Sequence, residues 1–156
     1  MLTQPTVDQL TSLGLVEMAH KWQQQQQDPE AAQLSFDERF AQLVDAQYLC
    51  NFNKRIARLL SEAKLRLGQA CVEDVDFPKS RELDRPLWRQ LVTGRYLDDK
   101  KGVLIVGATG TGKTYLACAL GQQACRQGRR VRYARTNRLL EELAVARADG
   151  SYPKAL

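Results

Sequence analysis

The sequence lacks long apolar runs, closely spaced cysteines and a signal peptide. No apolar run in its 156 residues approaches the roughly 18 residues of a membrane-spanning helix. The N-terminal residues are polar and mixed, without the basic-then-apolar order of a secretion signal. We therefore expect a cytoplasmic protein with no membrane partner, no disulfide and no metal cluster. The cysteines, which form no C-x-x-C pair, are Cys50, Cys71, Cys118 and Cys125.

Charge is unevenly distributed along a chain whose net charge is +5. Residues 1–52 carry two basic and seven acidic side chains, whereas residues 53–156 carry 21 basic and 11 acidic ones. This imbalance favours an anionic partner for the second portion, and nucleic acid is the usual candidate. Solvated side chains or pairing with acidic groups are the alternatives. Part of the excess lies in a cluster of arginines: Arg126, Arg129, Arg130, Arg132, Arg135 and Arg138.

One segment has a spacing from which its chemistry can be inferred. Residues 107–114 fit the phosphate-binding (P-loop) pattern G-x-x-x-x-G-K-[ST] at every fixed position. Glycines let the main chain turn its N–H groups inward as an anion-binding nest. We predict that Lys113 contacts the β- and γ-phosphates of a nucleotide and that the Thr114 hydroxyl binds Mg²⁺. The predicted nucleotide-binding residues are Gly107, Ala108, Thr109, Gly110, Thr111, Gly112, Lys113 and Thr114.

The sequence around this segment supports the interpretation. Residues 102–106 form a short aliphatic run typical of a buried strand, and a helix is expected from about Gly112 to Gly128. Residues 131–135 indicate a second strand, followed by a helix that Thr136 can cap. The order strand–helix–strand–helix predicts an α/β fold. Three leucines should form the buried face of the last helix: Leu139, Leu140 and Leu143.

The first 68 residues are predicted to form a helical domain. Two capping boxes, at residues 6–9 and 35–38, predict helices that begin near residues 7 and 36. Gly14 should divide the first helix and leave a second piece over about residues 16–27. Residues 36–67 have helical periodicity, and an interruption of this helix at residues 51–53 stays open. Gly68 should end the helix.

The later part of this helical stretch is amphipathic. Its outer face is basic, and this face either contacts DNA or is the solvated side of a core-packing helix. Residues 69–101 are interpreted as a linker with a short helix. The predicted domains are therefore the helical residues 1–68, this linker and a nucleotide-binding part over residues 102–156. The apolar stripe holds Phe52, Ile56, Leu59, Leu60, Ala63 and Leu67, and the basic face Lys54, Arg55 and Arg58.

Several stretches resemble the IstB-type helper ATPases of insertion-sequence transposition, relatives of the DnaC-type helicase loaders. The similar stretches are residues 34–39, 53–67, 107–119 and 139–152. Ala108 and Tyr115 stand where proline and histidine are common in that family. The resemblance implies an AAA+ fold with a small helical N-terminal domain that binds ATP. It also implies double-stranded DNA, a transposase and further copies of the chain as partners. A DnaC-like helicase loader and a non-enzymatic DNA- or partner-binding remnant are the alternatives.

The sequence departs from this family in the residues needed for hydrolysis. AAA+ ATPases also use an acidic Walker B strand, sensor residues and an arginine finger, and we recognise none of these up to Leu156. The one Asp-Asp pair, Asp98-Asp99, precedes the glycine-rich segment and follows no apolar strand. We therefore expect a truncated helper that does not hydrolyse ATP alone, and its status as an enzyme stays open. Residues 102–106 would also lack neighbouring strands, which predicts an incomplete sheet and exposed apolar surface.

Overall fold

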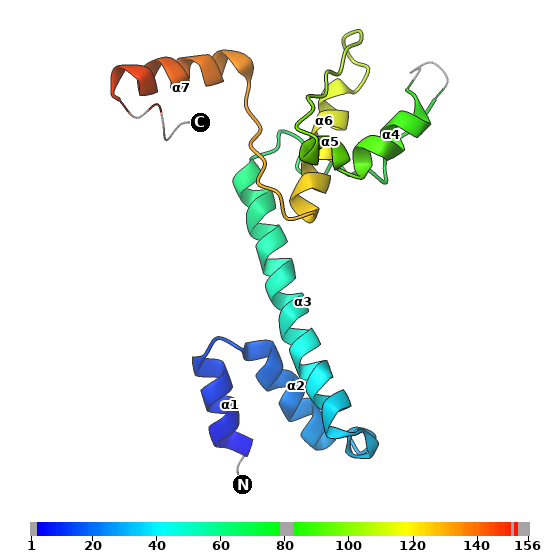
Figure 1. The fold of residues 1–156 in the computed structure, drawn as a ribbon, viewed down its shortest axis with the longest axis vertical. Coiled ribbons are helices and arrows are strands. Elements are labelled where there is room, and N and C mark those ends of the chain that lie inside the picture. Colours follow the sequence, from blue (N-terminus) through cyan, green and yellow to red (C-terminus); the bar gives the residue numbers. More distant parts are fainter. Residues whose placement is uncertain (1–2, 79–82, 151, 153–156) are drawn as a thin grey trace. The chain divides into compact units, whose positions relative to one another are not determined.

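The computed structural model describes residues 3–78, 83–150 and 152 (Figure 1). The chain divides into two compact units, residues 1–57 and residues 58–156. Helices dominate both units, and no residue in the described ranges belongs to a β-strand. The helices are α1 (Thr3–Ser12), α2 (Val16–Gln27), η1 (Ala31–Gln33), α3 (Phe36–Ala63), α4 (Arg85–Val92), α5 (Arg95–Asp98), α6 (Lys113–Arg126) and α7 (Thr136–Ala148).

The first unit consists of α1, α2, η1 and most of α3. The helices α1 and α2 pack against each other, and Gly14, at φ +77°, makes the turn between them. A side chain of α3 caps α2, because Gln47 Oε1 accepts hydrogen bonds from the main-chain N–H groups of Glu17 and Met18 at 3.1 and 3.2 Å. Gln47 is buried, so this amide fixes α2 on α3 without an ion pair.

The capping box of Ser35 is confirmed. The Glu38 N–H donates to Ser35 Oγ at 3.3 Å, and the Glu38 carboxylate accepts from the Ser35 N–H at 2.8 Å. The prediction for Thr6 is wrong, because α1 already begins at Thr3. Pro5 explains the difference: proline is favoured in a first turn, where its missing N–H needs no partner.

The interruption that the sequence left open at residues 51–53 does not occur, and α3 runs continuously through them. The side chain of Asn51 accepts a hydrogen bond from Gln47 Nε2 at 3.0 Å, so it does not compete for main-chain groups of the helix. The helix ends at Ala63, earlier than the predicted stop at Gly68. Lys64 adopts the left-handed φ of +48° directly after it, in the position that usually holds glycine.

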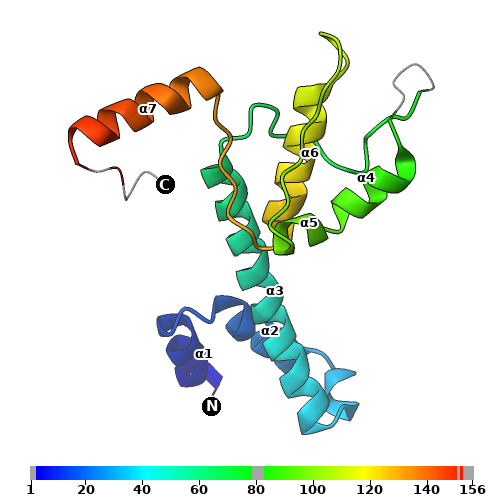
Figure 2. The ribbon, with the colours of Figure 1, turned by 45° about the horizontal axis from the view of Figure 1, so that its top comes forward.

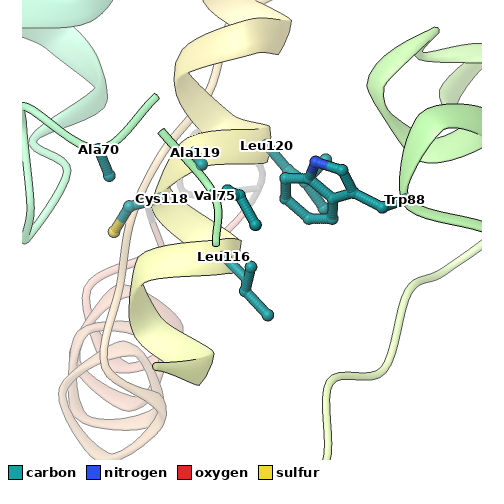
Figure 3. Close-up of a cluster of buried hydrophobic side chains, with 7 residues drawn as sticks. All are labelled: Ala70, Val75, Trp88, Leu116, Cys118, Ala119 and Leu120. Carbon is teal, nitrogen blue, oxygen red and sulfur yellow. The ribbon is translucent and has the colours of Figure 1, made fainter. Parts of the chain in front are cut away.

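The core of the second unit surrounds α6. Figure 3 shows Trp88, from α4, facing the side chains of α6, and it is only 5% exposed. Residues interpreted as linker therefore supply core side chains, and the domain boundaries proposed from the sequence stay predictions. The main cluster consists of Ala70, Val75, Trp88, Leu116, Cys118, Ala119 and Leu120.

The helix α6 begins and ends close to the predicted positions, and α4 is a short helix within the segment interpreted as a linker. Asp84 caps α4 by accepting from the Leu87 N–H at 3.2 Å. Gly128, at φ +79°, follows α6 as expected. The two helices are joined by Gln127, whose Nε2 donates to the carbonyl oxygen of Val92 at 3.1 Å. This bond satisfies a main-chain acceptor at the end of α4.

The two predicted strands do not form. Residues 102–106 and 131–135 are irregular, and Leu104 and Val106 are 86% and 79% exposed. A strand that is apolar on both faces needs a neighbour on each side, and these segments find none among the described residues. The predicted α/β class is therefore not formed in the described chain, which is helical. The exposed apolar surface that the sequence predicted is confirmed.

The end of α3 contacts α6 in the second unit through small side chains. Leu59 and Ala63 form a second buried cluster with Cys125. A Cβ at Gly121 would lie 3.1 Å from Leu65 Cδ2, so glycine permits this close approach. The Tyr133 N–H donates to the Ala63 carbonyl oxygen at 2.9 Å, which places residues 131–135 along the end of α3.

The last helix differs in detail from its prediction. The sequence predicts that Thr136 caps α7, but it is the first residue of the helix. The residue before it, Arg135, makes no side-chain hydrogen bond that caps the helix. Leu140 is 59% exposed, so its expected burial is wrong. The buried side chain of α7 is Ala146.

Candidate functional site

The segment predicted to hold phosphate forms a glycine-rich loop, residues 107–112, that leads directly into α6. Figures 1 and 2 show it projecting past the N-terminal end of that helix. Gly110 and Gly112 have φ of +85° and +84°, the left-handed region that glycine favours. Gly112 immediately precedes α6 and has no side chain with which to cap it. The first N–H groups of α6 are therefore open to an anionic ligand.

Lys113 closes this loop on itself. Its Nζ donates to the carbonyl oxygens of Gly107 at 2.9 Å and Ala108 at 2.6 Å. Thr111 Oγ1 donates to the same Ala108 oxygen at 2.9 Å. An ammonium group has three N–H donors, so one of them stays available while the loop holds this shape. The positive charge is thus positioned by the main chain, at the positive end of the α6 dipole.

The structure brings together some of the predicted residues and leaves others at the tip. Gly107, Ala108, Thr111 and Lys113 are joined by hydrogen bonds, whereas Thr109 and Gly110 are exposed. Thr114 lies half-buried in the first turn of α6. A single protein ligand such as the Thr114 hydroxyl is compatible with Mg²⁺, because waters and phosphate oxygens usually supply the remaining ligands of this ion.

The described residues hold no group of three or more His, Cys, Asp or Glu side chains that could bind a metal ion, and the four cysteines are free. Burial raises the pKa of the Cys125 thiol. Asp74, which accepts from Cys71 Sγ at 2.9 Å, raises the pKa of that thiol. Both shifts favour the protonated thiol over the thiolate, which is the form that coordinates metal and acts as a nucleophile.

The acidic pair Asp98-Asp99 is occupied by basic partners. Asp98 accepts a hydrogen bond from Arg129, and Asp99 pairs with Lys101 at 3.0 Å. These carboxylates neutralise neighbouring cations.

The predicted arginine cluster divides into paired and unpaired members. Arg126 pairs with Glu73 at 2.6 Å. A hydrogen bond from the main chain of Glu73 itself and then the bond from Arg126 lower the pKa of the Glu73 carboxyl. Arg129 and Arg132 pair with Asp98 and Glu142. The other three form no ion pair with any residue of the described ranges: Arg130, Arg135 and Arg138.

The unpaired arginines line a cavity of about 720 Å³ together with Lys64. We refer to this cavity as the basic groove, defined by Lys64, Arg130, Arg135 and Arg138. Sequence reasoning missed Lys64, which is distant in the chain and is brought in by the hydrogen bond between Tyr133 and Ala63. The basic face of α3 is exposed as predicted, and Arg58 on it pairs with Glu62 at 3.7 Å.

In the part of the chain that the structure describes, no helix combines the length and apolar character that crossing a membrane would require.

Comparison with known proteins identifies the family. A family model described as IstB-like ATP binding protein matches residues 8–156. An ATP-binding protein of insertion sequence IS1162 from Pseudomonas fluorescens is 44% identical over 156 residues, which cover 100% of this chain and 68% of the relative. The insertion-sequence ATP-binding protein y4pL of Sinorhizobium fredii is 41% identical over 154 residues, 99% of this chain and 62% of the relative.

A second Sinorhizobium fredii protein, y4uH, is 40% identical over 151 residues, which cover 97% of this chain and 60% of the relative. This chain thus spans 60–68% of the length of the three relatives. It belongs to the family of IstB-like ATP-binding proteins found in insertion sequences.

Proposed function

We propose that this IstB-like protein binds ATP through residues 107–114, as the nucleotide-binding component of an insertion sequence. The observation that carries the proposal is the position of Lys113. Its ammonium is held over the start of α6 by the carbonyl oxygens of Gly107 and Ala108. The same end of α6 presents N–H groups that no side chain of Gly112 covers. An ammonium, open N–H groups and a helix dipole all favour the phosphates of a nucleotide.

Binding then requires an exchange of hydrogen bonds. The two carbonyl oxygens that hold Lys113 are replaced, wholly or in part, by phosphate oxygens, which carry more negative charge. The loop can open because its glycines adopt left-handed φ values without strain. The Thr114 hydroxyl, one residue after Lys113, would hold Mg²⁺ on the phosphates, where the ion neutralises their charge.

We further propose that these 156 residues bind ATP without hydrolysing it on their own. Phosphoryl transfer needs groups that position water and stabilise charge on the phosphoryl oxygens. Asp98 and Asp99 form the chain's one Asp-Asp pair, and both are engaged by basic side chains. This pair also precedes the glycine-rich loop and follows no strand in the described ranges, which disfavours a Walker B role in holding Mg²⁺.

The proposed partners are double-stranded DNA, a transposase and further copies of the chain. The relatives that match along almost the whole chain are named for insertion sequences, which favours a transposase over a replicative helicase. The basic groove supports DNA as an anionic partner. The cytoplasmic location stays a prediction from the sequence.

Calorimetric titration with ATP and Mg²⁺ tests the nucleotide site. We expect saturable binding that Lys113→Ala weakens by roughly tenfold to a hundredfold, because a charge-assisted hydrogen bond contributes about 1.5–3 kcal/mol. Lys101→Ala is the matched control, since Lys101 is exposed and forms an ion pair with Asp99, outside the loop. Equal affinities of the Lys113 and Lys101 variants would refute the site.

A further inference from the structure

The basic groove is a second concentration of positive charge, separate in sequence from the glycine-rich loop. Its four cations come from three segments of the second unit: the end of α3, residues 130–135 and the start of α7. The hydrogen bond from Tyr133 to Ala63 holds the middle segment along the end of α3. The groove therefore combines three arginines that are near one another in the sequence with Lys64, which a tertiary contact brings to them.

The acidic side chains that line the groove are already neutralised. Glu62 pairs with Arg58 at 3.7 Å, and Glu142 accepts a hydrogen bond from Arg132. The four cations themselves have no ion pair within the described residues. Like charges gathered at one cavity repel each other, so an anion that joins them also relieves this repulsion.

A neighbouring cavity is also lined by cations. A second cavity of about 760 Å³ shares Tyr133, Arg135 and Arg138 with the first. It adds Arg66, a further cation from the segment after α3, and one carboxylate, Glu141. Cations that line two neighbouring cavities fit a chain of phosphates better than a single phosphate group. Phosphodiester backbones of nucleic acids carry their charges in such a series.

We propose that the basic groove binds the phosphodiester backbone of duplex DNA, through Lys64, Arg130, Arg135 and Arg138. This assignment rests on the proposed association of the chain with DNA and gives it a location. Backbone contacts position a protein on the duplex without reading sequence, so binding at the groove is insensitive to sequence. Each neutralised phosphate adds about 0.9 to the negative slope of log K against log salt concentration. Four contacts therefore give a slope of about −3.6.

Fluorescence polarisation with a short labelled duplex tests the assignment on the full chain without nucleotide. We expect the double variant R135Q/R138Q to lower the salt slope by about 2 and to weaken binding by roughly tenfold or more in moderate salt. Arg147→Gln is the matched control, because Arg147 lies on α7 nine positions after Arg138, two and a half turns away and on the opposite face of the helix. It does not line the groove and should bind as the unchanged chain does.

A second variant keeps the test independent of misfolding. Lys64 sits at φ +48°, which glycine adopts without strain, so Lys64→Gly removes a groove cation while relaxing the backbone. We expect an unchanged or higher melting temperature together with DNA affinity reduced by roughly fivefold to tenfold. Wild-type DNA affinity in Lys64→Gly and in the double variant would overturn the groove assignment.

Two further outcomes separate this inference from the function on which it rests. If the unchanged chain binds no DNA, the proposed DNA association fails, and the groove assignment fails with it. If DNA binds but the groove variants match Arg147→Gln, DNA association stands and only the groove assignment is overturned. Displacement of DNA by free ATP in the Lys113→Ala variant would make the groove a mononucleotide site and would also overturn the assignment.

Discussion

The glycine-rich loop and the basic groove both concentrate positive charge in the second unit, but they hold it in opposite ways. In the loop, the Lys113 ammonium is bonded by carbonyl oxygens of Gly107 and Ala108. In the groove, Lys64, Arg130, Arg135 and Arg138 have no ion pair within the described residues. A ligand of the loop must replace existing hydrogen bonds, whereas a ligand of the groove meets cations without ion-pair partners.

This difference leads to different kinds of binding. Replacing directed hydrogen bonds requires a ligand of matching geometry, so the loop should select among phosphates by their arrangement. Screened, flexible side chains accept phosphates in many arrangements, so the groove should respond chiefly to salt. The two regions can therefore be distinguished by experiment, although each is proposed to bind phosphate.

The largest expected effect is on the core that both regions share. Leu116 is 5% exposed and lies in α6, behind the loop. Leu116→Ala should destabilise the second unit by about 2–5 kcal/mol, through lost burial and a residual cavity. Chemical denaturation followed by circular dichroism measures this. Survival of both binding activities at unchanged stability would show that α6 does not support the two regions as described.

A change at Gly112 should damage the loop alone. Gly112 has φ +84°, where an L-residue costs about 1–2 kcal/mol. Gly112→Ala should weaken ATP binding by roughly tenfold and leave DNA binding unchanged, as measured by calorimetry and polarisation on the same preparation. The distinction between the two regions would be lost if DNA binding fell in parallel.

A change at Glu142 should strengthen DNA binding at the groove and leave ATP binding unchanged. Glu142 neutralises Arg132 at the edge of the cavity. Glu142→Gln releases that arginine, so the salt slope for DNA should steepen by about 0.9 while ATP affinity stays constant. Glu141→Gln, a neighbour in the second cavity with no ion pair among the described residues, is the comparison for the removal of charge alone.

The smallest effect on either region is expected from Ser35, in the first unit. Ser35 hydrogen bonds lower the pKa of the Glu38 carboxyl, so the capping box contributes stability above the ordinary carboxyl pKa. That stability is lost as the pH falls through the lowered pKa of the folded state. Ser35→Ala removes the hydroxyl bond but keeps the main-chain N–H that also donates to Glu38, so it should reduce this pH dependence of thermal unfolding and leave ATP and DNA binding unchanged.

The same contrast explains what the sequence could predict. The loop consists of consecutive residues, so its glycines and Lys113 could be recognised from spacing. The capping box of Ser35 and the ends of α6 are likewise local features. The groove depends on Lys64 meeting residues 130–138, a contact that no local pattern encodes. The pairing of Arg126, Arg129 and Arg132 was equally invisible, because their acidic partners lie elsewhere in the chain.

The strands were predicted wrongly for a related reason. Residues 102–106 have the apolar composition of a central strand, but a strand forms only where neighbours accept its hydrogen bonds. The composition of a segment indicates that it is suited to a buried strand, but it does not show whether neighbouring strands are present to pair with it. The high exposure of Leu104 and Val106 is the structural consequence.

Hydrogen–deuterium exchange with and without ATP and Mg²⁺ tests the central claim most directly, because it locates the nucleotide on the chain. We predict slower exchange of the main-chain amides of residues 107–116 on saturation, since N–H groups of the loop and the first turn of α6 would bond phosphate. Saturable ATP binding with unchanged exchange throughout those residues would contradict the assignment.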